Sequence, residues 1–249
     1  MRDGFSIYDS HAHLGVCLHS GRVQRLDDLL RAMDQCGVDR ALLIPFPVVE
    51  DYRATHEEIA RAVRGHPDRL AGAASLYPFI PEAEYRQEVR RCAEGFGFRA
   101  LKLQPQYQPL NPISSRSDFF FATALEYGLP VICHTGAGAP YALPSLYIMP
   151  ARKFPELRIV LAHAGGGLYA AEAMVAATVC PNIYVELSWL APHQTLAVLE
   201  HLPASRLMMG SDLLENLEAE IAKILRLDIP LEAKRHILFG TAAGVFGLE

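Results

Sequence analysis

The feature that most constrains the fold of this chain is a regular alternation between short apolar segments of strand character and segments whose apolar residues have helical spacing. The candidate strands span Phe5–His11, Arg40–Phe46, Leu70–Tyr77, Arg99–Gln104, Pro130–His134, Leu157–His163, Asn182–Ser188 and Arg206–Ser211. Helices are expected between them, among others at Leu26–Cys36, His56–Arg64, Glu82–Glu94, Asp118–Tyr127, Leu168–Val179 and Gln194–His201. Strands that alternate with helices in this way predict a parallel sheet of the α/β class.

Eight strand-helix units in 249 residues match the size of a (β/α)₈ TIM barrel without large insertions. We therefore expect a single domain over residues 1–249. A doubly wound open sheet is the alternative fold. It usually has a glycine-rich phosphate turn after its first strand, whereas this chain reads HAHLG at residues 11–15.

Composition excludes several classes of protein. The chain is 51% hydrophobic and carries a net charge of -5, so it lacks the basic excess that binding to nucleic acid or to anionic lipid requires. The five cysteines include no C-x-x-C pair, which fits a reducing compartment. With no apolar run long enough to cross a bilayer, we expect a cytoplasmic protein that acts on a small molecule, and we leave open its assembly into a homo-oligomer.

Polar side chains that can bind a metal recur where the predicted strands end. His11 and His13 lie two residues apart near the end of the first strand, so strand alternation points both to one side. His134 and His163 end the predicted fifth and sixth strands, and Asp212 follows the predicted eighth strand. Because barrels of this kind place active sites at the carboxyl ends of their strands, we expect these groups to converge there on one divalent ion, most plausibly zinc.

Four further side chains are candidates for contacts with the substrate or around the metal. Lys102 and Gln104 share the inner face of the fourth strand, as Glu186 and Ser188 do on the seventh. Lys102 could be an interior lysine paired with a carboxylate such as Glu186. One metal is expected rather than two.

The sequence motifs around these residues carry a resemblance to a known family. The motifs are DSHAHLG at 9–15, VICHTG at 131–136, VLAHAGG at 160–166 and MGSD at 209–212. In their order and spread the sequence resembles the amidohydrolase superfamily, and within it the amidohydrolase-related family that includes aminocarboxymuconate-semialdehyde decarboxylase. The resemblance implies a metal-bearing barrel with the ligands His11, His13, His134 and Asp212. It also implies that His163 orients the attacking water or the substrate and that Asp212 shuttles protons. The single domain over residues 1–249 would then be a catalytic barrel of the metal-dependent hydrolase type. Binuclear amidohydrolases bridge two metals with a carboxylated lysine from the fourth strand, and this resemblance makes Lys102 a candidate for that role.

Three positions depart from the family pattern. Gln104 stands where members often have histidine, and Thr241 and Gly244 stand where asparagine and arginine are usual. Gln104 offers a substrate only a neutral amide. The groups that asparagine and arginine anchor at positions 241 and 244 in the family must be anchored by other residues here.

Three functions remain open at this point. The first is hydrolysis of a small ester, lactone or amide by metal-activated water, with Asp212 as the proton acceptor and His163 at the developing oxyanion. The second is the non-oxidative decarboxylation of an aromatic or unsaturated carboxylic acid by the same ligands. The third is a non-catalytic scaffold that keeps its metal for stability. Hydrolysis is the main expectation from the sequence.

Overall fold

The computed structural model of the protein describes residues 1–136 and 140–247, so the last two residues of the expected domain lie outside the described part. Its centre is a curled sheet of nine strands in the order β2-β1-β3-β4-β5-β6-β7-β8-β9. The parallel strands are β1 (Tyr8–Val16), β3 (Arg40–Pro45), β4 (Leu70–Ala74), β5 (Ala100–Leu103), β6 (Val131–His134), β7 (Ile159–Ala162), β8 (Ile183–Glu186) and β9 (Leu207–Met208). They match the eight predicted strands, and all of them except β1 are shorter than predicted. The short β2 (Val23–Gln24) pairs antiparallel with β1 and was not predicted.

Backbone hydrogen bonds join the last strand to the first. The amide of Ser10 donates to the carbonyl oxygen of Met209 at 3.2 Å, and the amide of Asp212 donates to the carbonyl oxygen of His11 at 2.7 Å. An isolated parallel bridge also pairs Ala12 with Asp212. The sheet therefore closes on itself, and the predicted (β/α)₈ architecture is confirmed.

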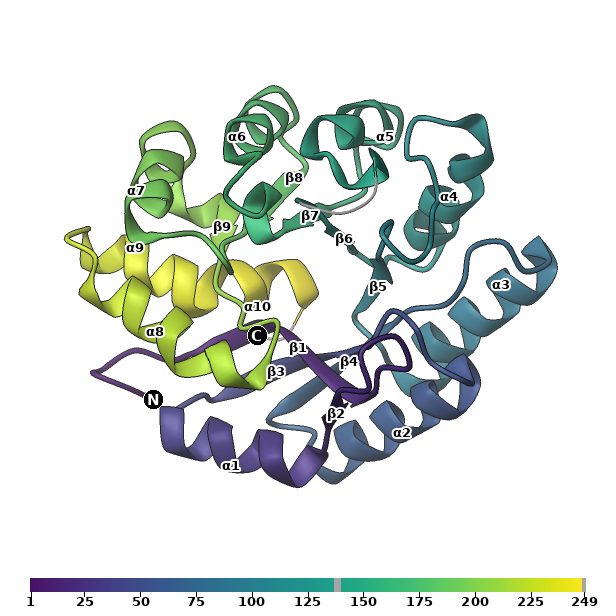
Figure 1. Ribbon diagram of the computed structural model, residues 1–249, viewed down its shortest axis with the longest axis horizontal. Coiled ribbons are helices and arrows are strands. Elements are labelled where there is room, and N and C mark those ends of the chain that lie inside the picture. Colours follow the sequence, from purple (N-terminus) through teal and green to yellow (C-terminus); the bar gives the residue numbers. More distant parts are fainter. Residues whose placement is uncertain (137–139, 248–249) are drawn as a thin grey trace.

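Helices cover the outside of the sheet, and Figure 1 shows them following one another around it from α1 to α7. The longer ones are α1 (Leu26–Cys36), α2 (Tyr52–Gly65), α3 (Glu82–Arg90), α4 (Asp118–Glu126), α6 (Ala170–Val179), α7 (Pro192–His201) and α8 (Leu217–Arg226). Shorter helices are α5 (Ile148–Lys153), α9 (Leu231–Arg235) and α10 (Thr241–Phe246). The six helices named from the sequence are all present; α3 continues as one π-helical turn, Arg91–Gly95.

Local sequence explains where these helices begin and end. In α1 the spacing of Leu29 and Met33 puts both side chains on the buried face. The helix ends at Gly37, whose φ of 72° is in the left-handed region that favours glycine. The helix α2 begins after Asp51, whose carboxylate accepts hydrogen bonds from the free amides of Arg53 and Ala54.

The buried core has two layers. The larger one lies between the sheet and its helices, where the outward side chains of the strands meet the apolar helix faces. The smaller one fills the barrel interior with side chains such as Tyr8, Ile132 and Met208. Val245 and Phe246 of α10 belong to this inner layer, so α10 packs against one end of the barrel. No helix in the described ranges is long and apolar enough to cross a lipid bilayer.

The first strand differs most from its prediction. It was expected to end at His11, but β1 runs on to Val16, because Gly15 and Val16 pair with β2. His11 and His13 therefore lie inside a strand and not at its end, which corrects the sequence analysis. The pairing of β1 with β3 also shifts register between Asp9 and Ala12. Such a bulge changes the direction of the side chains that follow it.

Candidate active site

His11 is held from both sides of its ring. The Nδ1 atom lies 3.2 Å from Oε2 of Glu186, and Nε2 lies 3.4 Å from Oδ1 of Asp212. The carboxylate of Glu186 only accepts, and the ammonium of Lys102, 2.9 Å from Nε2, only donates, so Nδ1 carries the proton and Nε2 keeps its lone pair. Burial, followed by the nearby Lys102, lowers the pKa of His11 well below its ordinary value. His11 is therefore a neutral imidazole whose Nε2 can bind a metal.

His13 presents the same nitrogen to the same carboxylate. Its Nδ1 lies 3.2 Å from the carbonyl oxygen of Ile44 and 3.1 Å from that of Pro45, so it donates to the β3 backbone. Its Nε2 lies 3.3 Å from Oδ1 of Asp212. The ring also stacks on Phe46, with centroids 4.8 Å apart and an interplanar angle of 12°. The strand β3 thus fixes both the tautomer and the ring plane of His13.

Asp212 follows β9, and its backbone amide donates the hydrogen bond to the carbonyl oxygen of His11 that helps to close the barrel. Burial alone raises the pKa of Asp212, but the hydrogen-bonding contact with His13 and the imidazoles of His163 and His11 outweigh burial and hold the pKa well below its ordinary value. Asp212 is therefore ionised at neutral pH. Beside it, Asp9 accepts hydrogen bonds from the amide and the hydroxyl of Ser211 at 2.8 and 2.6 Å, which fixes the turn that presents Asp212.

The converging atoms satisfy the chemistry of a divalent cation. His11, His13 and Asp212 each offer one ligand atom, and these atoms lie within 4.8 Å of one another. Imidazole nitrogens and a carboxylate oxygen are the ligand types that zinc and similar divalent ions take in proteins. The residues present therefore fit a metal ion.

Lys102 supplies a positive charge at the same place. It is buried on β5, and its Nζ lies 2.9 Å from Nε2 of His11. Burial lowers the pKa of Lys102 to about 8, against the opposing effect of Asp212 and Glu186. The side chain of Lys102 points inward, as strand alternation predicted. The alternative of a pair with a carboxylate such as Glu186 stays a prediction: Glu186 and Asp212 both act on the charge of Lys102, but in the described part of the chain its closest polar contact is Nε2 of His11 and no ion pair joins it to Glu186.

Glu186 is the centre of a hydrogen-bond network behind the metal-facing atoms. Its Oε2 accepts from Nδ1 of His11, from the backbone amide of His163 at 3.1 Å and from Oγ of Ser188 at 2.9 Å. Gly210 leaves the space for this network, because a Cβ there would meet Cβ of His11 at 2.7 Å and Oε1 of Glu186 at 2.9 Å. Partners of this kind orient metal-binding imidazoles and raise their basicity.

His163 is oriented by Ser188. Its Nδ1 lies 2.7 Å from Oγ of Ser188, which in turn donates to Glu186. This ordered chain places the proton of His163 on Nδ1 and leaves Nε2 as an acceptor. The ring lies 5.0 Å from that of His11 and 4.9 Å from that of Trp189, centroid to centroid. Burial lowers the pKa of His163 well below its ordinary value, so it is neutral.

Three residues of the site have strained backbones. His163, Trp189 and Asp212 have φ values of 66°, 68° and 62°, in the left-handed region that side chains with a Cβ rarely adopt. Each such residue costs on the order of 1–3 kcal/mol, and such strain concentrates at functional sites. That three of them meet at the carboxyl ends of β7, β8 and β9 marks this region as the candidate active site.

Two predicted site residues lie outside the compact set of His11, His13 and Asp212. His134 ends β6 and is buried, with its ring centroid 4.9 Å from that of His163, but it is not in the compact set of His11, His13 and Asp212. The side-chain oxygen of Gln104 accepts from the amide of Gln106 at 3.4 Å, within its own loop. In the described part of the chain no hydrogen bond joins Gln104 to another predicted site residue.

A further buried set, His56, Glu88 and Cys92, also brings possible ligand atoms together. Its donors and acceptors are already paired: Nδ1 of His56 lies 2.8 Å from Glu88, and Nε2 accepts from the amide of Ser75 at 3.0 Å. Burial raises the pKa of the Cys92 thiol far above its ordinary value. This set therefore has a structural role, tying α2 and α3 to the end of β4.

Sequence reasoning missed Trp189 and Phe46. Trp189 is the only tryptophan of the chain, is half exposed, and covers His163. Trp189 directly follows Ser188, which was expected to point inward. Strand alternation therefore predicts that Trp189 points outward, away from the site. The positive φ of Trp189 turns it back toward the site.

Comparison with solved structures supports the fold. The 2,6-dihydroxybenzoate decarboxylase from Rhizobium matches with a TM-score of 0.79 at 16% identity, over 98% of this chain and 99% of the other. The 5-carboxyvanillate decarboxylase from Novosphingobium aromaticivorans, in complex with manganese and 4-hydroxy-3-methoxy-5-nitrobenzoic acid, matches with a TM-score of 0.78 at 15% identity, over 99% and 97%. The 4-oxalomesaconate hydratase from Rhodopseudomonas palustris matches with a TM-score of 0.71 at 16% identity, over 97% and 95%.

At these identities the structures show a shared fold. The family is shown by sequence: the profile of the amidohydrolase family matches residues 8–248, nearly the whole chain. This range contains every predicted site residue and all four motifs on which the resemblance rested. The chain therefore belongs to the amidohydrolase family.

Proposed function

We propose that this protein is a metal-dependent, non-oxidative decarboxylase of a hydroxylated aromatic carboxylic acid, with residues 1–249 acting as one catalytic domain. Two of the three structural neighbours described above are decarboxylases of such acids. They match nearly the full length of this chain, so the alternative from the sequence analysis has more support than hydrolysis.

The observation that carries the proposal is the position of Trp189. Its half-exposed ring lies 4.9 Å from His163, beside the group of metal-binding side chains. Aromatic rings pack on one another with centroids about 4.5–7 Å apart, so Trp189 offers one wall for an aromatic substrate. Such a wall suits the ring of a hydroxybenzoic acid.

In the proposed site His11, His13, His134 and Asp212 hold the ion. When bound, a divalent ion would supply the positive charge that holds the oxygen atoms of an anionic substrate. Imidazole and carboxylate suit zinc and manganese alike, and the carboxyvanillate decarboxylase binds manganese. We therefore propose a divalent ion of either kind, and metal analysis of the purified protein decides between them.

The proton transfer is assigned to Asp212. Because Asp212 is ionised before the substrate binds, it first takes a proton from the acidic hydroxyl group of the bound substrate. It then delivers this proton to the ring carbon that carries the carboxylate. The bond from that carbon to the carboxylate breaks, carbon dioxide leaves, and the bonding electron pair returns to the ring.

His163 positions the substrate. Its Nδ1 is committed to Ser188, and its Nε2 accepts a hydrogen bond, so it can receive the hydroxyl proton of a substrate or orient that group toward Asp212. Glu186 fixes both histidines through its contacts with His11 and with the backbone of His163. The geometry is thus built before the substrate arrives, as catalysis by positioning requires.

Product analysis tests this function. The protein loaded with zinc or manganese is incubated with a panel of hydroxybenzoic acids and, separately, with aryl esters, lactones and anilides. We expect carbon dioxide and the corresponding phenol from at least one acid, and loss of that activity after chelation. Hydrolysis of the esters or lactones with no release of carbon dioxide from any acid would restore the hydrolase assignment, and turnover of neither class would favour the scaffold.

A further inference from the structure

A pocket of about 320 Å³ lies apart from the residues of the candidate active site. Its walls come from the segment between β4 and α3 and from the segment between β5 and α4. None of its lining residues is one of the predicted site residues. Its size falls at the lower end of the range for small-molecule sites.

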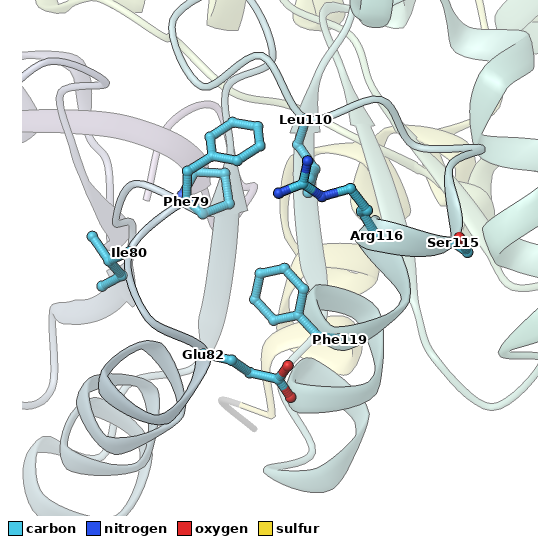
Figure 2. A pocket seen from close by; sticks show the side chains of 8 residues that line it. Phe79, Ile80, Glu82, Leu110, Ser115, Arg116 and Phe119 are labelled. Carbon is cyan, nitrogen blue, oxygen red and sulfur yellow. The ribbon is translucent and has the colours of Figure 1, made fainter.

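The lining of the pocket is mixed, with apolar rings and polar side chains, and Arg116 is its one cation. Figure 2 shows Phe79, Leu110 and Phe119 around it, with the guanidinium of Arg116 extending over Phe119 toward Phe79 and Leu110. Phe79 is 41% exposed, so part of its ring is open to a ligand. An apolar ligand that entered here would cover Phe79.

The charge of Arg116 is not balanced within the protein. In the described part of the chain its guanidinium has neither an ion pair nor a hydrogen bond. The acidic residue of the pocket, Glu82, accepts a hydrogen bond from Nε of Arg86 at 2.9 Å and so is already paired. The pocket therefore has an uncompensated positive charge, and the planar fork of an arginine suits a carboxylate.

The two walls are held in place before any ligand binds. The amide of Ser75, at the start of one wall, donates to Nε2 of the buried His56 at 3.0 Å. Nε2 of Gln108, in the other wall, donates to Oγ of Ser75 at 3.2 Å. Because both segments are tied to each other and to α2, the pocket is formed in the free protein, which lowers the entropic cost of binding.

From this geometry we infer a second binding site, for a small aromatic monocarboxylate, with the carboxylate on Arg116 and the aromatic body between Phe79 and Phe119. The inference does not rest on the proposed function, because it uses other residues and requires no metal.

Isothermal titration of the metal-loaded protein with 2-naphthoate tests the site. We expect saturable binding that Arg116→Gln weakens at least about tenfold, the effect of losing one charged hydrogen-bond partner. Phe79→Ala should weaken it as well through the apolar wall. The control Arg90→Gln removes another exposed arginine, which does not line the pocket and pairs with Glu94 in the π-helical turn that follows α3, so it should leave binding unchanged.

Two further titrations separate this site from the metal centre and from adhesion to apolar surface. The neutral amide 2-naphthamide should bind at least about tenfold more weakly than the acid. In Asp212→Asn, 2-naphthoate binding should persist. The inference is overturned if no saturable binding occurs at millimolar ligand, if acid and amide bind equally, if Arg116→Gln and Phe79→Ala leave binding unchanged, or if Asp212→Asn abolishes it.

Discussion

The carboxylate of Glu186 lies 3.2 Å from Nδ1 of His11, with Nε2 of that imidazole turned toward Asp212. One carboxylate thus fixes the tautomer of His11, and a second faces its free nitrogen. This relationship makes His11 a metal ligand in the proposed site and gives Glu186 its role, although Glu186 itself is not expected to touch the ion.

Replacing Glu186 with glutamine should therefore weaken metal binding without removing a ligand. Loss of a partner behind a metal-binding histidine typically costs about 10–100-fold in affinity. Competition for zinc with a chromogenic chelator measures it, with Glu232→Gln, at an exposed glutamate, as the control. Equal zinc affinity in Glu186→Gln and the unmodified protein would remove Glu186 from the proposed site.

The same network predicts an asymmetry between two glycines. Gly210→Ala places a Cβ within 2.7 Å of His11 and 2.9 Å of Glu186, so it should lower the free energy of unfolding by about 1–3 kcal/mol and weaken metal binding. Gly244→Ala, on an open face of α10 with no atom within 4 Å, should be neutral or should stabilise by up to about 1 kcal/mol. Denaturant unfolding of both variants measures the difference. Equal stability of the two would mean that the space at Gly210 is not restricted.

The buried pair of Glu88 and His56 predicts a pH dependence of stability away from the metal site. Burial by itself raises the pKa of Glu88, but hydrogen bonds from His56 and Arg91 outweigh burial and lower the pKa to about 2. A carboxyl whose folded pKa is depressed stabilises the fold above its unfolded pKa, near 4.5, and loses that contribution as pH falls toward 2.

Unfolding of the unmodified protein and of Glu88→Gln should therefore be compared over a series of pH values. We expect a constant stability difference in favour of the unmodified protein from neutral pH down to about 5, and a shrinking difference below it. A difference of the same size at pH 7 and at pH 3 would show that the charge of Glu88 contributes nothing.

Trp189 is expected to act on substrate binding rather than on folding. Trp189→Leu should raise KM for an aromatic acid by about two- to tenfold, the energy of one aromatic contact, with a smaller effect on kcat. Because the ring is half exposed, the free energy of unfolding should change by less than about 0.5 kcal/mol. Trp189→Phe should restore most of the affinity. An unchanged KM in Trp189→Leu would mean that the ring is no part of the substrate site.

The order of the strands and helices could be predicted from the sequence, because each strand of a barrel contributes a local apolar run. The agreement is closest where local chemistry decides the boundary, as in α1, which ends before Gly37. The agreement is poorest in β1. The extension of β1 to Val16 depends on its pairing with β2, and no local sequence pattern indicates that pairing.

The candidate site shows the same division. Strand alternation brought His11, His13, Asp212 and Lys102 to one region, and the structure places these side chains in contact. Alternation could not predict that Lys102 reaches His11 and not Glu186, since that choice depends on distances across the barrel. Nor could it find Trp189, whose direction is set by an unusual backbone conformation, or His56, whose partners lie on other elements.

The most direct test of the proposed decarboxylation uses deuterium to trace the proton that Asp212 delivers to the ring carbon. Metal-loaded protein is incubated in D₂O with the hydroxybenzoic acid that it turns over, and released carbon dioxide is measured together with the deuterium content of the phenol. We expect equal amounts of carbon dioxide and phenol, one deuterium on the ring carbon that carried the carboxylate, and at least about a hundredfold lower rate in Asp212→Asn. Full activity in Asp212→Asn would contradict the proton transfer assigned to Asp212, and the absence of carbon dioxide from every acid would contradict the decarboxylase itself.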